Sequence, residues 1–171
     1  MKTILIILDG VGDLPTPELG MKTPLEKAET PNMDYLASVG MNGLMDPIAP
    51  GVAPGSDVAH LAIFGYDPYR EYPGRGPFEA EGYGVELTEH EIALRANFAT
   101  VVRRGKRLMV VDRRAGRITK PLTLELAKAV NEAAGEEGLP VRFIPTVEHR
   151  GVLVIEGEGL SPEVTDTDPH A

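Results

Sequence analysis

The sequence predicts an α/β protein with a second, smaller α+β unit, and three observations lead to this fold class. Residues 3–8 contain the apolar run 4–8 and end at Asp9-Gly10, a pattern typical of a fully buried strand in an open sheet. Helix signals follow that run. After residue 85 the pattern changes to strand, strand, helix, strand, strand, which favours a mostly antiparallel sheet.

The first expected helix follows the apolar run after a proline-rich loop. Thr30 is a suitable N-cap, and Pro31 fits the first helical position, where no backbone N–H is needed. Gly40 is a typical helix stop. Residues 43–45 are expected to form a short strand.

A second short helix is expected over residues 56–65, capped by Ser56 or Asp57. Residues 66–84 are rich in Gly, Pro and Tyr, and we expect a long ordered loop there, since loops of this length are usually functional or disordered.

The second unit begins near Val85 and shows clear periodicity. Alternating apolar residues indicate strands, a turn is expected at Gly105, and one long segment has the apolar face of a helix. The expected elements are strands over 91–103, 108–111, 141–144 and 151–155 and a helix over 121–134.

Composition excludes several classes of protein. The formal net charge of −9 disfavours binding to nucleic acids. No apolar run approaches the roughly 20 residues of a membrane helix, and the amino terminus lacks a signal-peptide pattern. The chain has no cysteine, so thiolate metal sites are excluded. We therefore expect a cytoplasmic protein without nucleic-acid or membrane partners.

Basic residues nevertheless cluster within fifteen positions. Such a cluster in an acidic chain suits a small anionic ligand, although a solvated hairpin with charged edges is the alternative. The cluster consists of Arg103, Arg104, Lys106, Arg107, Arg113, Arg114 and Arg117.

Asp9 and Ser56 are the first candidates for chemistry. A carboxylate at the end of a buried strand needs an ion-pair partner or a cation, although Asp-Gly is also a common turn. Ser56 starts a helix, where backbone N–H groups attract anions, or it is a plain N-cap. His60 lies one turn later and either reaches this site or packs structurally.

Several arginines are candidates for binding an anion, because a guanidinium matches phosphate and carboxylate geometry. Arg75 has glycines on both sides that would let the backbone approach a ligand. Surface ion pairs are the alternative for each arginine. The other candidates are Arg95, Arg113, Arg114, Arg117 and Arg150, and the polar tail adds Asp166, Asp168 and His170.

Six segments together resemble the archaeal-type cofactor-independent phosphoglycerate mutases of the alkaline phosphatase superfamily. These are ILDGVGD at 7–13, KTPLEKAETPNMD at 22–34, GLMDPIAPGVAPGSDVAHLAIFGYDP at 43–68, GRGPFEA at 74–80, VDRRAGRI at 111–118 and the closing residues 165–170.

The resemblance implies interconversion of 2- and 3-phosphoglycerate in glycolysis, with Ser56 as the nucleophile that forms a phosphoserine. It implies two divalent metal ions (Mn, Mg, Zn or Co), with Asp9 and Ser56 among their ligands. It further implies that a small phosphorylated substrate is bound by Arg75, Arg113, Arg114, Arg150, Asp168 and His170.

The resemblance also implies a domain organisation. Residues 1–84 would be the amino-terminal part of an alkaline-phosphatase-like sheet with helices. Residues 85–160 would form an inserted α+β lid domain, and residues 161–171 a return segment toward a carboxyl-terminal half.

Family members are much longer, and their remaining metal ligands lie beyond the region that this chain matches. A fragment, a split gene with a complementing carboxyl-terminal chain, or a repurposed half-protein would each explain this. We expect a chain that is inactive alone and associates with itself or with such a partner. The alternatives are a non-catalytic half-domain that binds a phosphorylated metabolite or partner chain, and a related metal-dependent phosphatase or phosphomutase.

Overall fold

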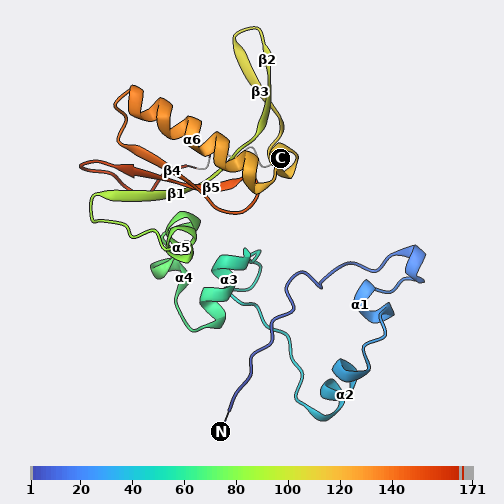
Figure 1. Cartoon of the computed structure of the whole chain (residues 1–171). Helices are drawn as coiled ribbons and strands as arrows, with labels where there is room; N and C mark the ends of the chain where they lie inside the picture. Colours follow the sequence, from blue (N-terminus) through green and yellow to red (C-terminus); the bar gives the residue numbers. More distant parts are fainter. Residues whose placement is uncertain (1, 166, 168–171) are drawn as a thin grey trace. The chain divides into compact units, whose positions relative to one another are not determined.

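The computed structural model describes residues 2–165 and 167, and the chain divides into two compact units. The first unit is Met1–Arg70 and the second is Glu71–Ala171 (Figure 1). The whole chain mixes helices with small sheets, so the α/β class is confirmed at that level.

The first unit consists of short helices joined by extended chain. Helix α2 has the predicted bounds, since it begins at Pro31 after Thr30 and ends before Gly40. The stretch expected to be a proline-rich loop instead contains a 3-10 helix and α1, which has a capping box between Thr23 and Glu26. The elements are a 3-10 helix Pro17–Leu19, α1 (Pro24–Lys27), α2 (Pro31–Val39) and α3 (Ser56–Ile63), followed by α4 (Pro68–Glu71) at the division.

The predicted strand over residues 3–8 is wrong for this structure. The segment is extended, and its side chains are exposed, by 83% at Ile4 and 74% at Ile6. A strand requires a neighbour for its N–H and C=O groups. The described part of the first unit has no other strand to supply one. The expected strand over residues 43–45 is also absent, for the same reason.

The second unit contains the predicted antiparallel sheet. Its three strands are β1 (Glu91–Asn97), β4 (Val141–Pro145) and β5 (Arg150–Glu156), in the order β1-β5-β4 with all neighbours antiparallel. A separate hairpin of β2 (Thr100–Arg104) and β3 (Arg107–Asp112) projects from the end of this sheet (Figure 1).

Two predictions in this unit need correction. The expected strand over 91–103 is two strands, because the chain leaves the sheet at Phe98, whose N–H donates to the His149 carbonyl oxygen at 2.7 Å. The expected loop over 66–84 contains two helices, α4 and α5 (Arg75–Gly82). Helix α5 forms because it has a sheet to pack against.

The core lies between α5 and the strands β1 and β5. Ala80, Ala93, Val152 and Val154 are buried in one cluster. Gly76 lies so close to β1 that a Cβ atom there would stand 2.0 Å from the Ala93 carbonyl oxygen. Close helix–sheet packing, rather than approach to a ligand, is therefore the structural reason for this glycine beside Arg75.

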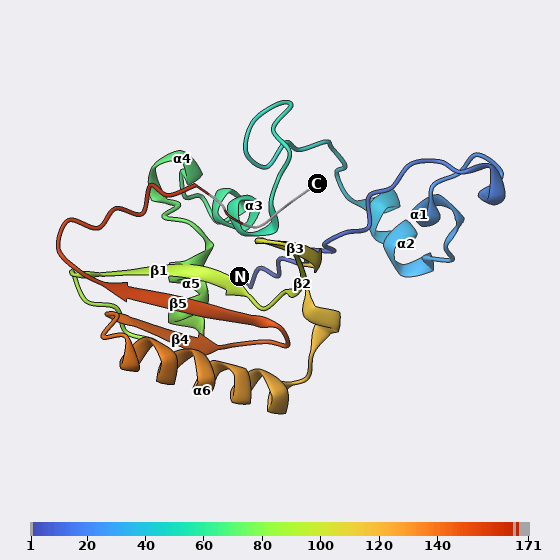
Figure 2. The ribbon, with the colours of Figure 1, turned by 90° about the horizontal axis from the view of Figure 1, so that it is seen from above.

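Helix α6 (Lys120–Glu136) runs beside β4 (Figure 2). The Asn131 side chain accepts from the Phe143 N–H at 2.7 Å and donates to the Phe143 carbonyl oxygen at 2.9 Å. These two bonds satisfy the backbone N–H and C=O of Phe143 on the edge strand β4, where unpaired groups could otherwise pair with another chain. At the other end of α6, the buried Thr123 hydroxyl donates to the Glu148 carbonyl oxygen at 2.5 Å.

Gly76→Ala should destabilise the chain by about 1–3 kcal/mol, because the added methyl group overpacks a rigid backbone contact. The matched control is Gly82→Ala at the end of the same helix. A Cβ atom there meets no atom within 4 Å, so this variant should be unchanged or more stable by about 0.5–1 kcal/mol. Urea unfolding followed by circular dichroism measures both, and equal stability of the two variants would refute the packing.

Candidate functional site

The structure brings Asp9 and Ser56 together in the first unit. The Ser56 hydroxyl donates to Asp9 Oδ2 at 3.1 Å, across 47 positions of sequence. Ser56 is the first residue of α3, and Gly55 is the N-cap, so the prediction that Ser56 or Asp57 caps the helix is wrong. The hydroxyl is consequently directed at Asp9 instead of at the backbone of its own helix.

Local sequence explains the placement of both groups. Gly10 has φ of +75°, so the chain turns directly after Asp9. Proline and glycine residues between 47 and 55 keep this segment irregular up to the start of α3. The N–H groups of a helix's first turn have no partner within the helix, so they offer donors to an anion beside Ser56.

His60 does not contact the Ser56 hydroxyl. Its Nδ1 lies 2.5 Å from the Ser56 backbone carbonyl oxygen, one helical turn back. Since a carbonyl can only accept, Nδ1 carries the proton in this contact. The imidazole therefore stabilises α3, and Asp9 is the side chain that the Ser56 hydroxyl contacts.

The Asp9 and Ser56 oxygens are suitable ligands for a hard divalent cation, which prefers oxygen donors. Such cations take about six ligands. Within residues 2–165 and 167, no group of three or more His, Asp or Glu side chains is placed to hold a metal ion. The two oxygens alone therefore do not complete a site for such a cation.

A basic turn follows β3 in the second unit. The Asp112 carboxylate accepts from the N–H groups of Arg114 at 2.8 Å and Gly116 at 2.6 Å, and these bonds hold the pKa of Asp112 below its usual value. Ala115 and Arg117 have φ of +46° and +55°, a strained conformation for residues with a side chain. The carboxylate thus fixes the backbone that carries Arg114 and Arg117.

His149 lies beside this turn and was not among the residues predicted from sequence. It is only 3% exposed, in the turn before β5. Burial is the main cause that lowers the pKa of His149. The cations Arg150, Arg114 and Arg117 lower it further, and Glu148 opposes them. The burial of His149 depends on the contact between the first turn of α6 and the β4–β5 turn. This contact joins residues far apart in the sequence, so a local sequence pattern does not predict it.

Three more of the predicted arginines lie in the second unit. Arg75 is exposed at the start of α5. Arg95 pairs with Glu79 at 3.5 Å inside the second unit, and Thr146 donates to that same carboxylate, so this ion pair links α5 to the sheet. Arg113 lies half-buried next to Arg114.

Seven further candidates lie either outside the described residues or on the β2–β3 hairpin. Asp166, Asp168 and His170 lie outside the described residues. Arg103, Arg104, Lys106 and Arg107 are on the exposed β2–β3 hairpin, where the predicted solvated hairpin is confirmed.

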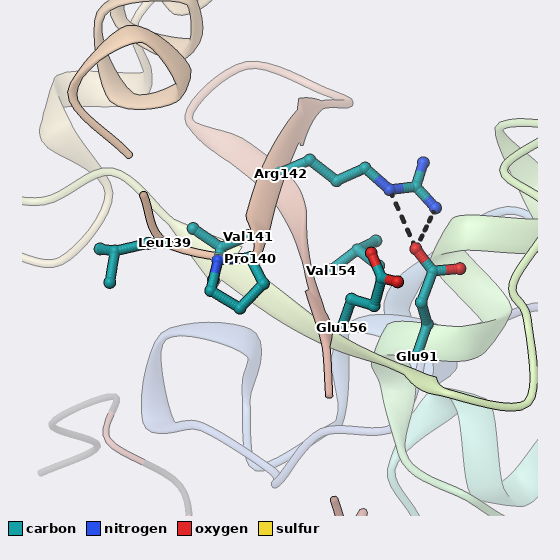
Figure 3. Close-up of a pocket in the computed structure, with 7 residues that line it drawn as sticks. All are labelled: Glu91, Leu139, Pro140, Val141, Arg142, Val154 and Glu156. Carbon is teal, nitrogen blue, oxygen red and sulfur yellow. Dashed lines mark hydrogen bonds and ion pairs between the residues drawn. The ribbon is translucent and has the colours of Figure 1, made fainter. Parts of the chain in front are cut away.

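The hollow in Figure 3 is not the candidate site. It lies at the β4 end of the sheet, lined by residues that include Leu139, Val141 and Glu156. Both Nε and Nη2 of Arg142 donate to Glu91 Oε1, at 3.3 and 2.9 Å. The Thr88 N–H also donates to Glu91, and these bonds lower the pKa of that carboxyl. The charges of Arg142 and Glu91 therefore neutralise each other.

The model of the family "2,3-bisphosphoglycerate-independent phosphoglycerate mutase" matches residues 37–171. A protein of that name from Ignicoccus hospitalis is 60% identical over 171 residues, which are 99% of this chain and 41% of the relative.

Two solved structures are also similar. A cofactor-independent phosphoglycerate mutase from Thermoplasma acidophilum is 44% identical, with a TM-score of 0.50 over 96% of this chain and 42% of that chain. A protein from Pyrococcus horikoshii is 41% identical, with a TM-score of 0.67 over 87% of this chain and 39% of that chain.

The relatives with a named activity are phosphoglycerate mutases, which are isomerases. The chain belongs to the 2,3-bisphosphoglycerate-independent phosphoglycerate mutase family. The resemblance predicted from six segments is thereby confirmed. The chain spans about two fifths of the length of the curated relatives it matches. No helix among the described residues is long and apolar enough to cross a membrane.

The lowered pKa of His149 predicts how stability depends on pH. The unfolded chain takes up a proton near the ordinary value of 6.5, whereas the folded chain keeps His149 neutral to lower pH. The free energy of unfolding should therefore fall as pH drops below about 6.5, by at most about 1.4 kcal/mol per pH unit. His149→Gln should reduce this slope in urea unfolding, and the exposed His90→Gln should not. Identical slopes for the wild type, His149→Gln and His90→Gln would contradict this prediction.

Proposed function

We propose that this chain provides the nucleophile of a phosphoglycerate mutase that interconverts 2- and 3-phosphoglycerate. The observation that carries the proposal is the Ser56–Asp9 hydrogen bond at the start of α3 in a chain of this family. A hydroxyl that contacts a carboxylate and adjoins first-turn N–H groups is placed to accept a phosphoryl group.

Ser56 Oγ loses its proton to solvent and attacks phosphorus, the bond from phosphorus to the substrate oxygen breaks, and a phosphoserine forms. The released oxygen takes a proton from solvent and becomes a hydroxyl of glycerate, and the return step reverses these proton transfers. The displaced glycerate reorients, and its other hydroxyl takes the phosphoryl group back. Asp9 Oδ2 orients the Oγ–H before attack. The first-turn amides of α3 stabilise the phosphoryl oxygens. Divalent cations, when bound by Asp9, Ser56 and further ligands, would lower the pKa of the hydroxyl; Mn, Mg, Zn and Co all suit the proposal.

The second unit binds the substrate in this proposal. The Asp112-fixed turn presents Arg114, and Arg150 begins β5 beside His149. Together with Arg75 and Arg113 they hold the carboxylate and phosphate of the substrate. Residues 85–160 serve as the lid, and Asp168 and His170 join it at the substrate.

The remaining metal ligands come from polypeptide corresponding to the three fifths of the relatives that this chain does not match. The exposed Ile4 and Ile6 support this proposal. Residues 3–8 have the composition of a buried strand and become one, in an alkaline-phosphatase-like sheet, when that polypeptide packs beside them. Glycolysis in the cytoplasm is the setting that follows from the substrate.

The test is a chimera in which this chain replaces the matching segment of the Ignicoccus hospitalis relative. With manganese, the chimera should convert 3-phosphoglycerate to 2-phosphoglycerate. Ser56→Ala should lower kcat by about 10⁴-fold or more, because the covalent intermediate is lost. The control is Ser38→Ala, since Ser38 only donates to the Tyr35 carbonyl oxygen in α2.

Each alternative function has its own signature in this experiment. Full activity in Ser56→Ala would remove the nucleophile. Hydrolysis of generic phosphate esters without mutase activity would establish a phosphatase instead. A folded chimera that binds 3-phosphoglycerate but turns over neither substrate would leave a binding protein.

A further inference from the structure

His149 is a buried group that the proposed reaction has not used. Its side chain is 4% exposed, and its Nδ1 has no hydrogen-bond partner among the residues that the structure describes. The nearest recorded acceptor is Glu148 Oε2 at 3.8 Å, beyond hydrogen-bonding distance. A buried polar atom without a partner destabilises the fold, so such an atom calls for a reason.

The backbone around His149 is held firmly. The buried Thr123 hydroxyl donates to the Glu148 carbonyl oxygen, and the Phe98 N–H donates to the carbonyl oxygen of His149 itself. Glu148 has φ of +51°, an uncommon conformation that these bonds maintain. The imidazole is therefore fixed with one nitrogen unused.

The charged groups near this imidazole are mostly cations. On its own turn they are Arg150 and the opposing Glu148, and from the turn after β3 they are Arg114, Arg117 and Asp112. Arg150 Nε is also buried without a hydrogen-bond partner. Asp112 is already engaged by two backbone N–H groups. The remaining unmatched donors in this place suit an anion.

We propose that His149 binds the phosphoryl group together with Arg114, Arg117 and Arg150, and takes up a proton from solvent as it does so. This inference rests on the proposed function, which assigns substrate binding to the same turn. A bound dianion reverses the local balance of charge, which at present disfavours the imidazolium ion. The protonated Nδ1 then donates to the phosphoryl oxygen, and the buried atom gains its partner.

The experiment follows the ring carbons of His149 by NMR in the 171-residue chain, with and without inorganic phosphate. The pKa of His149 should rise by about one unit or more on binding. His90, which is half exposed beside Glu89 and Glu158, is the internal control and should stay unchanged. Calorimetry in two buffers of different ionisation enthalpy should show proton uptake in the wild type and not in His149→Gln.

Three outcomes would overturn the inference. The first is an unchanged pKa of His149 while the backbone signals of Arg114 and Arg150 respond to phosphate. This result would show that phosphate binds there without proton uptake by His149. The second is an equal shift at His90, which shows general screening. The third is no phosphate response in the second unit. Mutase activity of the chimera and of its Ser56→Ala variant is measured separately, so none of these results decides whether Ser56 is the nucleophile.

Discussion

Burial of apolar side chains is the constraint on which the rest of this structure depends. In the second unit, Val152 and Val154 are almost fully buried because α5 packs against β1 at the distance that Gly76 permits. In the described part of the first unit no side chain reaches that degree of burial, and Ile4 and Ile6 are exposed. The second unit therefore has a core of its own, whereas the first needs further apolar contacts to be stable.

This difference determines what each unit can do. In the second unit, Asp112 holds the backbone of the strained turn that carries Arg114 and Arg117, so this backbone is fixed before a ligand arrives. The Ser56–Asp9 pair depends on one exposed hydrogen bond and offers two oxygens where a divalent cation takes about six. Such a pair needs more polypeptide to become a complete site, and the relatives in this family are more than twice as long.

Elements with local signals could be predicted from sequence. Thr30-Pro31 and Gly40 bound α2, and period-two alternation predicted the antiparallel strands. Elements that depend on distant neighbours could not. Residues 3–8 have a strand's composition without a strand beside them, and α5 depends on the close contact of Gly76 with Ala93. Of the site, the Ser56–Asp9 contact followed the prediction, whereas the buried His149 depends on the way Thr123 holds the β4–β5 turn.

The most direct test of the central claim is to locate the metal. Crystals of the Ignicoccus hospitalis chimera grown with manganese would be measured at the manganese absorption edge. The account predicts an anomalous peak within roughly 2–2.5 Å of both Asp9 and Ser56 Oγ, the range for oxygen ligands of such cations. Fully occupied manganese sites that lie beyond bonding distance of both Asp9 and Ser56 Oγ would contradict the account. The Ser56 hydroxyl would then be activated only by its hydrogen bond to Asp9.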